Sequence, residues 1–285
     1  MLHESDAHRL NEFSAYDDEN FPLLECALHI SKLLTPSFKT DLYLVKYDDL
    51  FDQFKSHCPP DPLDGITLQD KINALRYFFI EIHHFFEAEE SFFDLDAHNF
   101  FKIFDHKEAT PLTLAILFLS ATRFCQWRSF YPNFPIFSLI GLEEKDQRLF
   151  FDPSQNCQLA DSSHLRQMLK TAAGRDKELN PHYFDPVPAK TLIIRYIQPI
   201  KSHFIRCENY IKAIEMLSAC LCLDPKADSF LRERALLHAR CKNFTDAKKD
   251  MGLAIQYCED PEKILQMQTF LKNLKPSNHS LHIVK

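Results

Sequence analysis

Thr113 is the residue that the chain places best for nucleophilic chemistry. It lies near the start of ATPLTLAILFLSATRF, residues 109–124, a run that reads as a buried helix. The first turn of a helix favours a nucleophile, because the helix dipole stabilises negative charge there. Cys125 follows twelve residues later, about 18 Å along a helix at ~1.5 Å per residue, and cannot share that site. A threonine hydroxyl also needs a base to become a nucleophile, so the simpler expectation is a helix-capping hydroxyl.

A second polar group, IEIHHFFEAEE at residues 80–90, invites a metal-binding interpretation. His83 and Glu87 are four residues apart and would share one face of a helix. One helix provides only two or three ligands, and no second segment with comparable spacing provides the rest. We therefore expect a solvated acidic face and no metal.

The composition indicates a globular protein without a bound cofactor. The chain has 285 residues, 45% of them hydrophobic and 26% charged, and its 26 Phe are enough for large cores. Its four scattered Gly cannot form a phosphate-binding or dinucleotide-binding loop. The longest apolar run, residues 112–121, is about half of the ~20 residues that a membrane span needs. The start lacks a secretory signal, and nine cysteines without a CxxC motif are typical of reduced thiols, so we expect a cytoplasmic protein.

The charge is unevenly distributed. Residues 190–285 carry 16 Lys and Arg against 10 Asp and Glu, whereas the rest carries 17 against 30. Phosphates would repel so acidic a body, and no basic residues interleave with its aromatic ones, so we expect neither nucleic-acid nor membrane binding. The oligomeric state is left open.

The elements that must position these residues follow from the periodicity. Residues 1–20 are polar and expected to be frayed. Apolar residues then recur at helical spacing over 21–54 and in one long helix over 66–90. The runs NFPIFSLIG and RLFFDPSQN flank the polar turn EEKDQ and indicate a β-hairpin. Pro181, Pro186 and Pro188 mark a boundary, which gives an α+β domain over residues 21–189.

A repeat follows the boundary. Asn209–Tyr210, Ala213, Leu217 and Cys220 recur, with related residues, 34 positions later. This is the tetratricopeptide period, and it predicts paired helices over residues 190–275. The helix over residues 261–274 would cap the stack, and residues 276–285 form a C-terminal tail.

The order of these motifs resembles a known family. The run LDAHNFFKIFDHKEATPLTLAILFL, then NFPIFSLI and FFDPSQN, then the repeats, resembles the largely uncharacterised bacterial SirB-one type family. That family joins a transglutaminase-like domain to tetratricopeptide-like helices. The resemblance covers roughly residues 70–275 and implies a transglutaminase/papain-like core with a small antiparallel sheet.

The resemblance also implies three site positions. Thr113 matches the nucleophile that opens a helix, where this family tends to have a hydroxyl. Residues 133–138 match the family's Asn-Phe-Pro-Gly-His-Phe, which puts Phe137 at the catalytic His, and Asp152 matches the orienting acid. Ser138 is expected to face the other side of the strand, because side chains alternate. His98 or His106 would have to fold back to restore a base.

We therefore expect a non-enzymatic cytoplasmic adaptor or regulatory protein that uses a degenerate transglutaminase-like fold as a binding surface. A mildly basic groove containing Lys201, Arg234 and Lys242 would bind a protein or peptide partner. The alternative is a hydrolase or acyl-transferase that acts on protein amide groups, with a rearranged site near Thr113 and Asp152 and an unidentified base.

Overall fold

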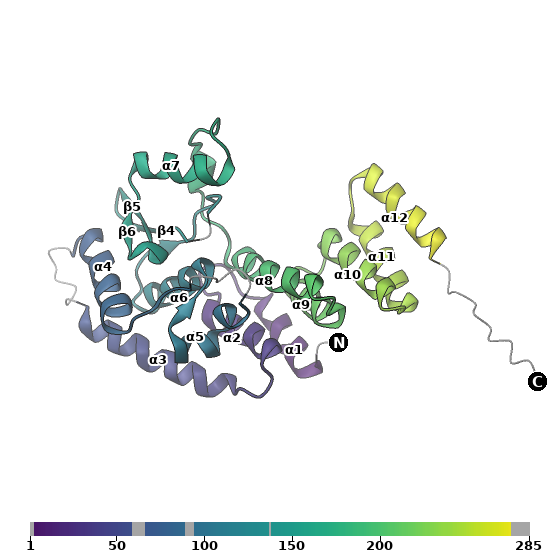
Figure 1. Cartoon of the computed structure of the whole chain (residues 1–285), viewed down its shortest axis with the longest axis horizontal. Helices are drawn as coiled ribbons and strands as arrows, with labels where there is room; N and C mark the ends of the chain where they lie inside the picture. Colours follow the sequence, from purple (N-terminus) through teal and green to yellow (C-terminus); the bar gives the residue numbers. More distant parts are fainter. Residues whose placement is uncertain (1–2, 59–65, 89–93, 137, 275–285) are drawn as a thin grey trace, which may run out of the picture. The chain divides into compact units, whose positions relative to one another are not determined.

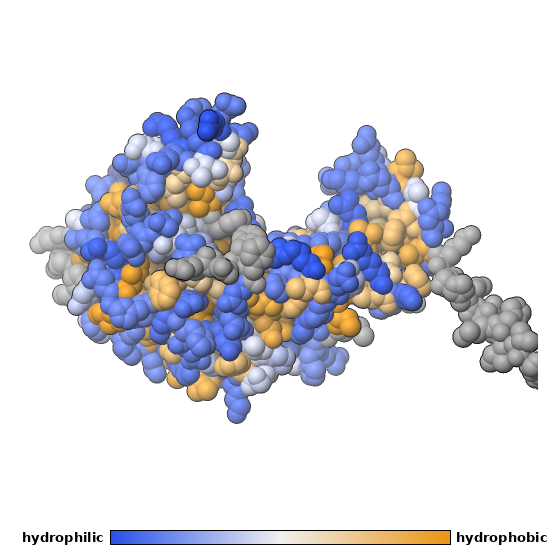
Figure 2. Space-filling model, viewed as in Figure 1, coloured by the Kyte–Doolittle hydropathy of each residue, from blue (hydrophilic) through white to orange (hydrophobic). Residues whose placement is uncertain are grey.

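The computed structural model describes residues 3–58, 66–88, 94–136 and 138–274. The chain has the expected α+β fold and divides into two compact units, one of residues 16–196 and one of residues 1–15 with 197–285. Within the described residues, no helix combines the length and apolar character of a membrane span. Figure 2 shows polar residues over most of the face that it draws, with hydrophobic residues in small separate groups.

The unit of residues 16–196 combines helices with a small antiparallel sheet (Figure 1). Its α-helices are α2 (Leu23–Leu34), α3 (Thr40–His57), α4 (Leu68–Leu75), α5 (Phe100–His106), α6 (Pro111–Phe124), α7 (Ser162–Ala173) and the start of α8 (Ala189–Arg206). Its short helices are η1 (Arg76–Ile82), η2 (Asp96–His98), η3 (Pro153–Gln155) and η4 (Pro181–Phe184). Its strands are β1 (Phe86–Glu87), β2 (Glu108–Ala109), β3 (Ser129–Phe130), β4 (Ile140–Glu144), β5 (Gln147–Asp152) and β6 (Gln158–Leu159).

Helix α6 is the central element of this unit, and local sequence sets where it begins. The Thr110 side chain accepts a hydrogen bond from the Thr113 amide, and Pro111 occupies the first helical position, where no amide hydrogen is needed. Every residue from 112 to 122 is buried, in contact with α2 and α3 among others. Phenylalanine supplies much of the surrounding core: Phe54, Phe78, Phe79, Phe100, Phe101 and Phe118 are almost fully buried.

The predicted hairpin is present as β4 and β5, inside a sheet of order β3-β4-β5-β6. Gly141 of β4 pairs with Phe130 of β3. A Cβ at Gly141 would lie 2.3 Å from the Phe130 ring, so only glycine fits beneath that ring. The Phe130 ring also packs edge to face with Phe150, 5.9 Å between centroids, and the Arg148 guanidinium lies over it, 4.6 Å from its centroid. The packing fixes the register of the sheet that ends at Asp152.

The prediction of a single long helix over residues 66–90 is wrong. Helix α4 ends at Leu75 and continues as the π-helix η1, and His84 then takes a left-handed conformation with φ 55°. The chain leaves the helix there and forms β1, which pairs in parallel with β2. His83 and Glu87 therefore do not share a helical face, and Glu89 and Glu90 lie outside the described residues.

The second unit is entirely helical within its described residues. It contains α1 (Glu4–Phe13), the end of α8, α9 (Tyr210–Leu223), α10 (Asp228–Arg240), α11 (Phe244–Tyr257) and α12 (Pro261–Asn273) (Figure 1). The 34-residue repeat is visible in the geometry of its turns. Glu208 and Lys242 both have positive φ, 57° and 61°, and Asn209 and Asn243 cap the helices that follow. Helix α12 contacts α11, as a capping helix would.

Two expected boundaries differ from the observed ones. The segment expected to be frayed contains α1, which contacts α9 and buries Leu10 and Phe13 completely, because these two apolar residues share a helical face. The prolines before residue 189 mark the start of α8 and not the border between units, which falls at residue 196 inside that helix. Pro199 also lies inside α8.

Candidate functional site

The first part of the candidate site is a pair of hydroxyls at the start of α6. The oxygens of Thr110 and Thr113 are 2.7 Å apart, and both residues are buried. The capping residue is Thr110 and not Thr113, because Pro111 occupies the first helical position and the cap is the residue directly before it. The Thr113 hydroxyl therefore bonds to a second hydroxyl, which is no proton acceptor strong enough to make it a nucleophile.

The second part is the carboxylate of Asp152, which ends β5 and caps η3. One oxygen accepts from the Ser138 hydroxyl at 2.6 Å. The other accepts from the Ser154 amide at 2.9 Å and the Ser154 hydroxyl at 2.8 Å. Asp152 and Ser138 are each only 2% exposed, so this carboxylate is stabilised by three protein donors and not by water.

The expectation that Ser138 faces away from the site is wrong. Strand β4 begins at Ile140, so Ser138 precedes the strand and the alternation of side chains does not apply to it. The Ser138 hydroxyl donates a hydrogen bond to the Asp152 carboxylate. Phe137, expected to replace the catalytic His, lies outside the described residues.

Glu87 connects the two parts and was not expected in this place. It pairs with Ala109, the residue before Thr110, across β1 and β2. Burial raises the pKa of the Glu87 carboxyl, the Ser154 hydrogen bond opposes that shift, and the Asp152 charge adds to it. Both α6 and η3 contact β1 and each other, so the polar groups lie within one region of the domain.

In the described part of the chain, no imidazole hydrogen-bonds to Thr113 or Asp152. His98 is buried at the end of η2, and His106 is exposed at the end of α5. The imidazole that does reach the NFP segment is His182 of η4, which lies 3.1 Å from the Asn133 amide nitrogen and 2.7 Å from Asp185. Cys157 does not replace the missing nucleophile either, because burial, reinforced by the Asp152 charge, raises the pKa of its thiol and keeps it protonated.

Comparison with known proteins identifies the domain that carries these residues. The model of the transglutaminase-like superfamily matches residues 42–198, more than half of the chain. The chain belongs to the transglutaminase-like superfamily. The matched region contains Thr113, Asp152 and the other polar groups of the site, so the resemblance expected for this domain is confirmed.

The chain is also similar to two curated proteins over much of its length. The chain is 22% identical over 279 residues to a UPF0162 protein of Xylella fastidiosa strain 9a5c, covering 95% of this chain and 96% of that protein. It is 23% identical over 173 residues to a UPF0162 protein of Haemophilus influenzae, covering 61% and 64%. No solved structure matches the chain.

The three basic residues expected to line a groove lie in different surroundings. Lys201 is buried in the helical unit, where its ammonium donates to Glu233 and to Gln198, each at 2.7 Å. The Arg234 guanidinium forms a bidentate pair with Asp250, both contacts at 2.7 Å. Lys242 is exposed in its turn. Two of the three charges are thus neutralised inside the unit, which differs from the expected exposed groove.

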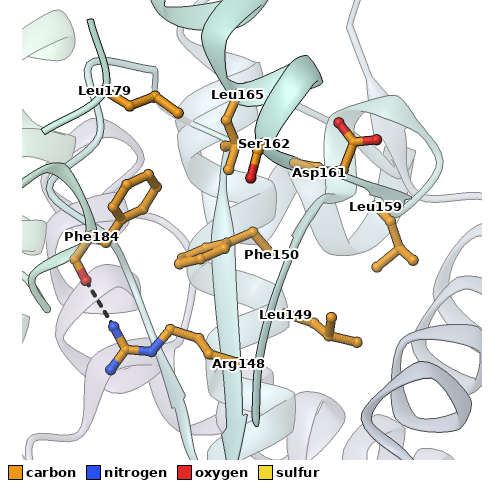
Figure 3. A pocket seen from close by; sticks show the side chains of 10 residues that line it. Arg148, Leu149, Phe150, Leu159, Asp161, Ser162, Leu165, Leu179 and Phe184 are labelled. Atoms are coloured by element: carbon orange, nitrogen blue, oxygen red, sulfur yellow. Dashed lines mark hydrogen bonds between the residues drawn. The ribbon is translucent and has the colours of Figure 1, made fainter. Parts of the chain in front are cut away.

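The transglutaminase-like domain also contains an apolar pocket of about 440 Å³ between β5, β6, α7 and η4. Figure 3 shows the Phe150 ring in the middle, with Leu165, Leu179 and Phe184 around it. Arg148 donates to the Phe184 carbonyl at 3.3 Å and closes one side. No group of three or more His, Cys, Asp or Glu in the described residues is arranged to hold a metal ion.

Proposed function

We propose that this protein is a non-enzymatic adaptor or regulatory protein of the cytoplasm, related to the SirB-one type family, in which a degenerate transglutaminase-like domain serves as a binding surface. The observation that carries the proposal is the bonding of Asp152. In this superfamily the orienting acid holds a catalytic imidazole, and here it holds the hydroxyls of Ser138 and Ser154. A hydroxyl in that position can neither accept a proton from a nucleophile nor return it to a leaving group.

The apolar pocket supports binding of a protein or peptide partner. Its volume of about 440 Å³ lies within the range of sites that bury apolar ligand groups. Leu159, in the two-residue strand β6 at the end of the sheet, lines the pocket and is 37% exposed. An apolar side chain of the partner would enter beside Phe150, and the partner backbone would lie near β6. The repeat helices, with Lys242 in an exposed turn, would add contacts.

The test uses the full-length chain as bait, with partners crosslinked in an extract of the source bacterium. The substitution Leu159→Arg places a charge at the mouth of the pocket and should reduce capture of a specific partner at least tenfold. Leu42→Arg is the matched control, because Leu42 belongs to the same unit, is 54% exposed and does not line the pocket. Equal capture by both variants would exclude the pocket as the binding surface.

One observation favours the alternative, a hydrolase or acyl-transferase that acts on protein amides. Glu87 is a carboxylate with a raised pKa beside Ser154, and such a carboxylate is a stronger base than an ordinary one. The alternative requires ammonia release from glutamine-containing proteins, lost in both Thr113→Ala and Glu87→Gln. The adaptor proposal expects wild type and both variants to give the same background rate.

A further inference from the structure

A second cavity in the unit of residues 16–196 contains two cysteines and lies apart from the groups described above. Its volume is about 510 Å³, and Cys58 and Cys125 both line it. Cys58 directly follows α3 and Cys125 directly follows α6, and each donates its backbone amide to the last turn of its helix. The two helices contact each other, so residues far apart in the sequence meet at their C-terminal ends.

Aromatic packing keeps these helix ends together. The Phe51 and Phe124 rings lie 5.6 Å apart, and Phe54 contacts Trp127 at the same centroid distance. Both cysteines line the cavity and are partly exposed, and each thiol is close enough to shift the pKa of the other. A small solute can therefore reach both sulfurs within one cavity, and disulfide formation needs two sulfurs that lie close together.

The charges around the cavity favour a thiolate at Cys125. Accepting the hydrogen bond from the Cys58 thiol lowers the pKa of Cys125, and the nearby Lys55 ammonium adds to this effect although partial burial opposes it. The same hydrogen bond, with burial, raises the pKa of Cys58. The other charged residues that line the cavity are Lys71, Arg128, Lys145, Glu143 and Glu144. Of these, Lys71 is paired with Glu144 at 2.8 Å.

We propose that Cys58 and Cys125 are a peroxide-oxidisable dithiol, with Cys125 as the attacking sulfur and Cys58 as the resolving one. The Cys125 thiolate attacks one oxygen of hydrogen peroxide, the O–O bond breaks, and the departing hydroxide takes a proton and leaves as water. Cys125 is then a sulfenic acid. The Cys58 sulfur attacks it, an S–S bond forms, the S–O bond breaks and a second water leaves with the Cys58 proton. The two thiols give up two electrons to the peroxide in total.

The test treats the full-length reduced chain with one equivalent of hydrogen peroxide, alkylates the remaining thiols and digests with trypsin. Cys58 and Cys125 fall in the tryptic peptides 56–71 and 124–128, each of which contains a single cysteine. The expected product is these two peptides joined, lighter than their sum by two hydrogen atoms. Cys207 and Cys241 are exposed in turns of the helical unit and serve as internal controls. The linked peptide should form at least ten times faster than either control thiol is lost.

Single substitutions separate the roles of the two sulfurs. In Cys58→Ser, Cys125 should accumulate as a sulfenic acid that a cyclic 1,3-diketone traps. In Cys125→Ser, oxidation of Cys58 should slow at least tenfold. Loss of Cys207 and Cys241 thiols while Cys58 and Cys125 still react with the alkylating agent would overturn the proposal. Because that measurement uses the unsubstituted protein, the outcome does not depend on the folding of the variants.

Discussion

The hydrogen bond between Ser138 and Asp152 gives the sharpest test of the candidate site. If the carboxylate now has a structural role, removing it should destabilise the domain. Asp152→Ala deletes an acceptor of three hydrogen bonds and leaves the buried Ser138 hydroxyl and the half-buried donors of Ser154 without this acceptor. A hydrogen bond to a charged group contributes about 1.5–3 kcal/mol, and an unsatisfied buried donor costs about 1–3 kcal/mol. The expected loss is on the order of 4 kcal/mol in the free energy of unfolding.

A double-mutant cycle isolates the single bond. Ser138→Ala alone should cost about 2 kcal/mol, because the contact is short and both partners are buried. In the double variant much of that cost is already included in the loss of Asp152, which leaves a coupling energy of about 2 kcal/mol. Equilibrium unfolding in urea measures each value. Trp127 is the one tryptophan of the chain and lies in the same unit, so its fluorescence reports unfolding of that unit.

Ser154→Ala is the matched control. It removes one hydroxyl from the same carboxylate but keeps the backbone amide donor, so the expected loss is only about 1 kcal/mol. A coupling energy below about 0.5 kcal/mol between Ser138 and Asp152 would refute the structural role. So would an Asp152→Ala variant of normal stability that has lost an amide-hydrolysing activity of the wild type.

Three further outcomes are expected. Gly141→Ala should destabilise the sheet by about 1–3 kcal/mol, because the added carbon would overlap the Phe130 ring. Gly252→Ala adds a carbon in open space on α11 and should stabilise the protein by up to about 1 kcal/mol. Thermal unfolding measures both changes. Burial holds the pKa of His238 below its ordinary 6.5, so on acidification the unfolded chain binds this proton before the folded chain does. The helical unit should therefore lose stability as the pH falls below about 6.5. In circular dichroism melts at pH 7.5 and 5.5, His238→Gln should reduce that loss. Lys201→Glu should lower the stability by at least about 3 kcal/mol in the same melts, because two carboxylates would then meet at Glu233. Lys201→Met removes the charge without adding a second carboxylate and should cost less. Equal losses of stability in the two variants would mean that the ion pair with Glu233 does not determine the loss.

Elements defined by local signals were predictable from the sequence. The apolar run over 109–124 predicts α6, and the Phe- and Ile-rich runs around EEKDQ predict the β4–β5 hairpin. In both cases neighbours in the sequence provide the cap, the turn and the buried face. The prediction of one long helix over residues 66–90 is wrong for the opposite reason. The pairing of β1 with β2, about twenty residues further on, ends it, and helical periodicity contains no information about that partner.

The site depends on contacts that no local pattern encodes. Ser138 meets Asp152 because it lies just before β4, and the alternation rule applied to it presupposed a strand. Residue type alone assigns Lys201 and Arg234 to a basic groove, but their acidic partners lie on other helices of the unit. Cys58 and Cys125 are brought together only when α3 and α6 end side by side.

The hydrogen bonds around Asp152 follow from its burial, with or without turnover. A carboxylate that is 2% exposed must have donors around it, since an unpaired buried charge costs several kcal/mol. Replacing the imidazole that such an acid holds removes a donor, and the fold then needs another one. The hydroxyl of Ser138 provides it at 2.6 Å, and Ser154 provides two more donors. Once this network exists, loss of the acid is costly whether or not any reaction takes place. In a transglutaminase-like domain, an acid without its histidine is therefore no sign of catalysis.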